Sequence, residues 1–247
     1  TDVFNCCGWY NSVEADTRLD KPGNPAMLFN NRPSSPIEDY KQITRKASLT
    51  YGGVYENTTG FNALNVFNTS TGNFKDMDTA YGSIQLLYSR DTNLFVFQED
   101  KTHRVLYQKD VLFDADGTGN IRQSSNVLGQ EVPFTGEYGI CKNPESFATY
   151  GNRIYHLDLE RGCLLRLSLD GYTEISKNGM PDYFRPLSQD RGTDRFVAGY
   201  NPYDDVYMIN TNLTGTENTL AFNETVNGFV SFYSFVPEIL FDHNNRL

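Results

Sequence analysis

Residues 145–176, ESFATYGNRIYHLDLERGCLLRLSLDGYTEIS, predict four short strands in succession, each reversed by a tight turn. The reversals are expected at residues 150–152, 160–162 and 170–171. Asp170-Gly171 is a strong hairpin signal because both residue types tolerate the positive φ that a type I′ turn needs. Four antiparallel strands of this kind form one meander sheet, typical of a blade of a β-propeller or one sheet of a sandwich.

The third of these strands shows a clear alternation. Cys163, Leu165 and Leu167 are expected on one side, and Arg166 and Ser168 on the other. A period of two residues is typical of a half-buried strand, with one face packed and one face in water.

The same four-strand plan recurs along the chain. Strand groups are expected to begin near residues 83, 146 and 195, and a further copy near residue 239. A meander repeated at such spacings is typical of propeller blades. We therefore predict an all-β fold, a propeller-like array of four-stranded antiparallel meander blades, with a sandwich as the alternative.

The segments between these groups carry turn chemistry. Residues 1–46 are rich in Asn, Pro and Gly and predict an irregular arm or linker, with a short helix at residues 37–43. Residues 73–80 predict one or two helical turns, and residues 113–144 a long loop. The β domain is expected to span residues 47–247 and to continue beyond this chain, as a fragment of a longer protein.

Composition excludes some classes of function. The formal net charge is −10, which argues against a surface that grips nucleic acid but suits a wall that DNA passes without binding. No stretch reaches the about 20 apolar residues of a membrane span. The cysteines are Cys6, Cys7, Cys141 and Cys163, and free thiols are expected, with a bridge from Cys6 or Cys7 to Cys141 as the alternative.

Three runs carry a resemblance to a known family: residues 81–117, 136–184 and 195–235, including GEYGICKNPESFATYGNRIYHLDLERG and RFVAGYNPYDDVYMI. In this order they resemble the muzzle or nozzle-type tail proteins of crAss-like and related short-tailed bacteriophages, over about residues 40–247. Cys141 and Cys163 depart from that pattern, which has small or polar residues there.

The resemblance implies a virion structural protein, a propeller-containing subunit of the ring at the distal end of the tail. Such a subunit lines or gates the channel for DNA and cargo ejection. Its implied partners are copies of itself, other tail proteins (ring or adaptor, fibre or spike proteins) and DNA in transit without specific binding. The implied location is the phage tail, after assembly in the bacterial host cytoplasm.

No catalytic, cofactor-binding or metal-binding residues are predicted, and no enzyme activity. The chain has three histidines, His103, His156 and His243. His103 and His156 lie in expected strands, so we expect their side chains to be packed rather than catalytic. Residues 114–120, DADGTGN, begin like a calcium loop, but the twelfth position lacks the bidentate Glu, which favours an ordinary turn. The alternative function is a glycan-binding or glycan-cleaving β-propeller, with Trp9-Tyr10 and Tyr200 to Tyr207 as stacking candidates.

Overall fold

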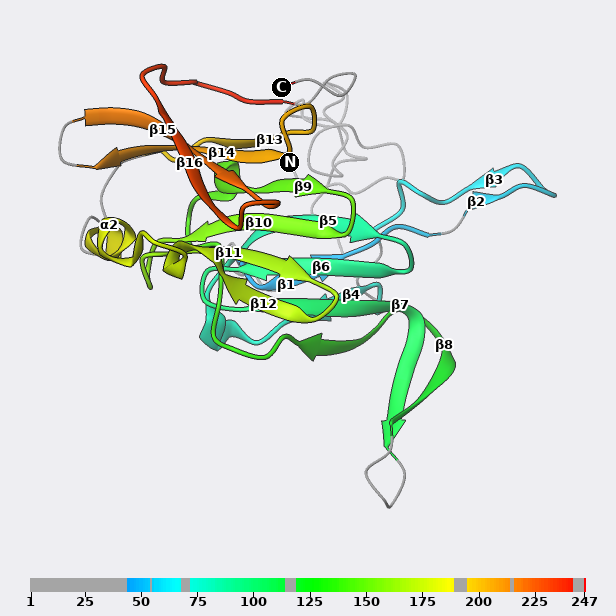
Figure 1. The fold of residues 1–247 in the computed structure, drawn as a ribbon. Helices are drawn as coiled ribbons and strands as arrows, with labels where there is room; N and C mark the ends of the chain where they lie inside the picture. The colour runs from blue at the N-terminus through cyan, green and yellow to red at the C-terminus, as the bar shows by residue number, and fades with distance from the viewer. Residues whose placement is uncertain are drawn as a thin grey trace, which may run out of the picture. The chain divides into compact units, whose positions relative to one another are not determined.

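The computed structural model describes residues 44–53, 55–67, 72–113, 119–188, 195–213, 216–241 and 247. Contacts divide the chain into Thr1–Thr44 and Arg45–Leu247, and the fold below is that of the second unit. The helix expected at residues 37–43 lies outside the described residues. The described part is all-β with little helix (Figure 1).

Three four-stranded antiparallel sheets follow one another along the chain, each with its strands in sequence order. The first sheet contains β5 (Ile84–Arg90), β6 (Asn93–Gln98), β7 (Thr102–Phe113) and β8 (Gly119–Pro133). The second contains β9 (Ala148–Tyr150), β10 (Arg153–Asp158), β11 (Cys163–Ser168) and β12 (Gly171–Glu174). The third contains β13 (Ala198–Asn201), β14 (Val206–Leu213), β15 (Thr216–Asn223) and β16 (Gly228–Tyr233). The prediction of four-stranded antiparallel meanders is confirmed, whereas the described sheets do not close into a propeller.

Short elements complete the described chain. Two-stranded pairs join β1 (Ser48–Thr50) to β4 (Phe74–Asp76), and β2 (Tyr55–Glu56) to β3 (Phe61–Asn62). The helical pieces are η4 (Thr79–Tyr81), η5 (Pro144–Ser146), η6 (Ile175–Lys177), α2 (Pro181–Phe184) and η7 (Arg185–Ser188). The helical turn expected within residues 73–80 is therefore short, and a strand takes the first half of that segment.

The long loop expected at residues 113–144 is wrong, because β8 lies inside it and completes the first sheet. The pairing of β7 with β8 shifts register between Val105 and Tyr107 and again between Tyr107 and Lys109. Gln108, at the second shift, has a φ of +51°. These bulges break the alternation of side chains, so the strand has no period that a sequence could reveal.

The strand expected at residues 239–241 is also wrong. Within the described residues after β16, the chain runs without a regular element. Thr219 Oγ1 donates to the carbonyl of Phe235 at 2.7 Å, which holds the segment against β15. Leu240 then packs on the third sheet, while Ile239 and Phe241 on either side of it are exposed.

The turn between β11 and β12 differs from the expected type. Ser168 pairs with Gly171, so Leu169 and Asp170 form the loop. A positive φ occurs at Gly171 (+103°) but not at Asp170. One left-handed residue after the turn is the pattern of a bulged hairpin rather than of a type I′ turn, which needs two.

The second sheet is buried on both faces, so the expectation of a half-buried strand is wrong. Leu164 packs with Tyr155 and Leu157 in a core shared with the third sheet. Leu167 and Ile154 pack on the opposite face, against Phe97 and other side chains of the first sheet. The second sheet is thus the middle layer of a stack, packed on one face against the third sheet and on the other against the first.

The outer faces of the stack are covered by short segments of chain. On the first sheet, Val96 and Val105 pack under Ala47, Leu49 and Met77. On the third sheet, a smaller cluster joins Val206, Met208 and Ala221 to Leu240 and Leu247. Full burial of one such side chain stabilises by about 1.5–3 kcal/mol, so each cover stabilises the sheet that it lies on.

Candidate functional site

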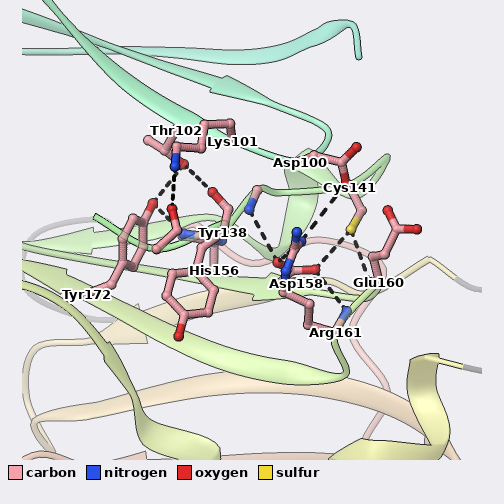
Figure 2. A network of polar contacts seen from close by, with 12 residues as sticks. Asp100, Lys101, Thr102, Tyr138, Cys141, His156, Asp158, Glu160, Arg161 and Tyr172 are labelled. Carbon is pink, nitrogen blue, oxygen red and sulfur yellow. Dashed lines mark hydrogen bonds and ion pairs between the residues drawn. The ribbon is translucent and has the colours of Figure 1, made fainter. Parts of the chain in front are cut away.

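A buried carboxylate holds the connection between the first and second sheets, residues 134–147. Asp158, at the end of β10, is fully buried. Its Oδ2 accepts hydrogen bonds from Gly139 N–H at 3.2 Å and from Arg161 Nη1 at 2.9 Å. Its Oδ1 accepts from Arg161 N–H at 3.1 Å and from the Cys141 thiol at 3.3 Å (Figure 2). With both oxygens occupied, Asp158 is an anchor rather than a free acid or base.

Cys141 takes part in the same cluster as a protonated thiol. Burial, followed by the charge of Asp158, raises the pKa of Cys141 to about 12. The thiol therefore keeps its proton, which it donates to Asp158, while its sulfur accepts from Glu160 N–H at 3.2 Å. Cys141 and Cys163 are free thiols, so no disulfide involves Cys141, and Cys6 and Cys7 lie outside the described residues.

A chain of hydrogen bonds runs beside this cluster, from His156 to the first sheet (Figure 2). Tyr172 Oη donates to Thr102 Oγ1 at 2.7 Å, and Thr102 donates in turn to the carbonyl of Tyr138 at 3.1 Å. Tyr172 must then accept from His156 Nε2, 3.1 Å away, which places the imidazole proton on that nitrogen. Burial lowers the pKa of His156 to about 3, so the ring is neutral.

A second buried carboxylate joins the second and third sheets. Glu224, just after β15, accepts from Tyr155 Oη at 2.5 Å and from Arg166 Nη1 at 2.8 Å. Arg153 Nη1 lies 3.7 Å from the same carboxylate. Both hydrogen-bond donors and the nearby Arg153 come from strands of the second sheet and the acceptor from the third, so this cluster clamps one sheet to the next.

Stacked tyrosines line the same contact. The rings of Tyr150, Tyr200, Tyr155 and Tyr207 follow one another, with centroids 4.4, 5.5 and 5.0 Å apart. Tyr207 Oη donates to the carbonyl of Ser146 at 2.7 Å, which ties η5 to the third sheet. Aromatic pairs of this kind add about 0.5–1.5 kcal/mol each beyond the area that they bury. Tyr200 and Tyr207 are therefore core residues and not sugar platforms.

The described residues bring no metal-binding set together. His103 is buried on β7 beside the ring of Tyr81, and burial lowers its pKa; His243 lies outside the described residues. In the described part of the chain, no group of three or more His, Cys, Asp or Glu side chains is placed to hold a metal ion. Most of the calcium-like turn, at residues 114–118, is not described. No helix among the described residues is long and apolar enough to cross a membrane.

The glycan alternative named aromatic side chains as stacking candidates. Of the aromatic candidates, Tyr203 is exposed and Trp9 and Tyr10 are not described.

An exposed apolar surface is the feature that sequence reasoning missed. It is formed by side chains that follow β16, namely Phe235, Val236, Ile239 and Phe241. Ile239 and Phe241 are each 69 % exposed, although Leu240 between them is packed on the third sheet. A run of apolar side chains left in water is typical of a surface that binds another protein. The sequence analysis expected a strand here and did not predict exposed apolar side chains.

The chain matches one known family. The family model described as Crassvirus muzzle protein covers residues 68–247, which is more than half of the chain and includes all three sheets. No curated protein matches the chain.

Proposed function

This chain belongs to the Crassvirus muzzle protein family and is thus a structural protein of the phage tail, and we propose that it forms a ring at the distal end of that tail. The ring would line or gate the channel through which DNA and cargo proteins leave the virion. In this role the protein works by shape and rigidity, and no catalytic residue is needed.

The stack of sheets carries the proposal. A channel wall must keep its shape while a genome passes, and both faces of the second sheet are buried against neighbouring sheets. The buried carboxylates Asp158 and Glu224 add hydrogen bonds where the second sheet meets its two neighbours. These bonds restrict sliding of one sheet against the next. We infer that the three sheets are consecutive blades of a propeller, and that residues 1–46 form an arm or linker that precedes a β domain beginning at residue 47.

The exposed apolar surface and the net charge of this chain indicate which partners it would have. Copies of this chain would meet in a closed ring, which satisfies the surfaces of each subunit, and the apolar segment after β16 is suited to such contacts. Other tail proteins, of the ring or adaptor, fibre or spike kind, would contact the remaining surface. A net charge of −10 would let DNA pass by repulsion, without specific binding. Assembly is expected in the host cytoplasm.

Electron microscopy of intact particles tests this proposal. We expect density for this fold in a ring at the distal end of the tail, with the stack of three sheets in every subunit. Intact mass of the polypeptide from purified particles would show the length of the mature chain. Absence of the protein from particles, or a stable monomer that cleaves glycans, would refute the proposal.

A further inference from the structure

The distal half of the β7–β8 hairpin leaves the first sheet. The pairing of β7 with β6 ends at Leu106, whereas its pairing with β8 continues to Phe113. Two register shifts between Val105 and Lys109 separate these halves, and bulges of this kind bend and twist a strand. Figure 1 shows the result, a two-stranded ribbon that runs out from the first sheet. The ribbon comprises residues 109–113 and 119–123 of these strands.

One face of the ribbon is apolar, with a cation at its base. Val111 pairs with Ile121, and Lys109 with Gln123, so these four side chains point to the same face. Lys109 Nζ lies 3.4 Å from Thr92 Oγ1, where the ribbon leaves the sheet. The side chain of Ile121 is 65 % exposed, and a ribbon of two strands is at best marginally stable in water on its own. We therefore expect another surface to cover this face when the protein assembles.

The exposed apolar surface after β16 has a complementary composition. Residues 234–241 are SFVPEILF, and Glu238 is the one charged residue among them. Glu238 is exposed and lies in the sequence between the exposed residues Val236 and Ile239. This surface thus presents apolar groups and one anion, whereas the face of the ribbon presents apolar groups and one cation, Lys109. Burial of the apolar groups would hold the two together, and the opposite charges would set their register.

The ribbon and the apolar surface belong to opposite ends of the stack of sheets. The ribbon starts from the first sheet, the apolar surface lies on the third, and the second sheet is packed between those two. In Figure 1 the ribbon points away from β13–β16. A contact between the two features therefore joins two copies of the chain. Because it uses a different surface on each copy, it is a head-to-tail contact, the kind that closes into a ring when the rotation between copies allows it.

We propose that the ribbon of one subunit lies on the apolar surface of the next, with Ile121 packed against Ile239 and Phe241 and with Lys109 beside Glu238. This contact rests on the proposed ring and identifies the two surfaces through which neighbouring subunits meet. A second copy is the occupant, rather than another tail protein, because this chain carries both halves of the contact in apolar area and in charge.

Charge reversal tests the contact, with self-association measured by sedimentation velocity. Lys109→Glu places two carboxylates against each other, so association should weaken about tenfold, and addition of Glu238→Lys should restore it. The matched control combines Lys109→Glu with Glu137→Lys. Glu137 is an exposed residue of the connection between the first two sheets, so this variant has the net charge of the restored one without the restored pair. It should associate as weakly as Lys109→Glu alone.

A photoreactive benzophenone amino acid at position 121 locates the partner surface. In a mixture of nitrogen-15-labelled and unlabelled chains, we expect cross-links from position 121 to residues 235–241 that combine the two labels. The same amino acid at position 122 is the control. Arg122 pairs with Asp110 on the opposite face of the ribbon, so these cross-links should not form from there.

The outcomes separate this contact from the ring itself. Cross-links between copies that avoid residues 235–241, or association that Glu238→Lys does not restore, would overturn the contact and leave the ring in place. The absence of any self-association and of any cross-link between copies would overturn the ring as well. Melting temperatures show that each variant is folded. If Lys109→Glu fails to fold, Glu238→Lys alone replaces it, because two cations facing each other should weaken association to a similar extent.

Discussion

Asp158 holds the connection between the first and second sheets, and Glu224 joins the second sheet to the third. Each is a carboxylate withdrawn from water, and each accepts from an arginine of the second sheet, Arg161 or Arg166. A charge in such a place is tolerated only while its donors remain, because burial without partners costs several kcal/mol. These charged side chains therefore fix how neighbouring sheets meet. In the sequence they look like ordinary acidic and basic residues.

Asp158→Asn should lower the free energy of unfolding by about 2–4 kcal/mol, because Arg161 and the thiol of Cys141 lose their charged acceptor. Asp182→Asn is the matched control. Asp182 also pairs with an arginine three residues on, Arg185 at 3.3 Å, but its side chain is 88 % exposed, so a change below about 0.5 kcal/mol is expected. Urea denaturation measures both, and equal effects would contradict the role of burial.

His156 makes the stability of the fold depend on pH. Its folded pKa of about 3 lies below the ordinary value of about 6.5, so the unfolded chain binds the proton more readily. Stability is complete above the ordinary value and falls as pH drops toward 3, by at most about 1.4 kcal/mol per pH unit.

His156→Gln, which retains a donor toward Tyr172, should flatten the dependence of stability on pH between about 6.5 and 3. Denaturant titrations at a series of pH values compare the two proteins. His103 is present in both, so its contribution cancels in the difference. Parallel curves would show that the imidazole of His156 does not have to be neutral for the sheets to pack.

Turns set how closely the elements approach one another. Gly162, between β10 and β11, has a φ of +58°, and a Cβ at this position would lie 2.7 Å from the carbonyl oxygen of Phe184. Gly151, between β9 and β10, has nearly the same φ of +56° but open space around it. The first glycine thus serves both the turn and the packing of α2 on the second sheet, whereas the second serves the turn alone.

Gly162→Ala should destabilise the protein more than Gly151→Ala does. Both variants carry the cost of a left-handed alanine, about 1 kcal/mol, and only Gly162→Ala adds a contact with rigid backbone. Thermal unfolding of the two variants gives the comparison. If their melting temperatures fell equally, α2 would be free to move away from the turn.

The strand groups were predictable from sequence because apolar residues and turn residues alternate regularly within them. β8 was not, since two register shifts remove its period, and neither was the double burial of β11. Leu164 shows why: it is buried like Leu165, although their side chains point to opposite faces. A sequence records the pattern of one strand, whereas burial depends on which sheets lie on either side of it.

The buried clusters were beyond prediction for a related reason. Glu224 and Arg166 are far apart in sequence and meet only because the third sheet packs on the second. The sequence contains nothing that marks these residues as a clamp. Only the stacking of sheets, a property of the whole molecule, gives them partners.

At the scale of the whole molecule, the apolar segment after β16 links the fold to assembly. Ile239 and Phe241 contribute little to the isolated chain, since each is 69 % exposed, whereas Leu240 is packed on the third sheet. Substitution of the exposed pair should therefore affect association between subunits, and substitution of Leu240 should affect folding. The two effects are separable because neighbouring residues point in different directions.

The double variant Ile239→Asp with Phe241→Asp should keep the melting temperature within a few degrees of the wild type but weaken self-association at least tenfold. The reason is that two carboxylates would have to be buried without partners in any contact that covers this surface. Sedimentation velocity over a range of concentrations measures association. Leu240→Asp is the control and should lower the melting temperature, because it places a charge against Val206 and Met208. If the double variant assembled as well as the wild type, subunits of the proposed ring would have to meet through another surface.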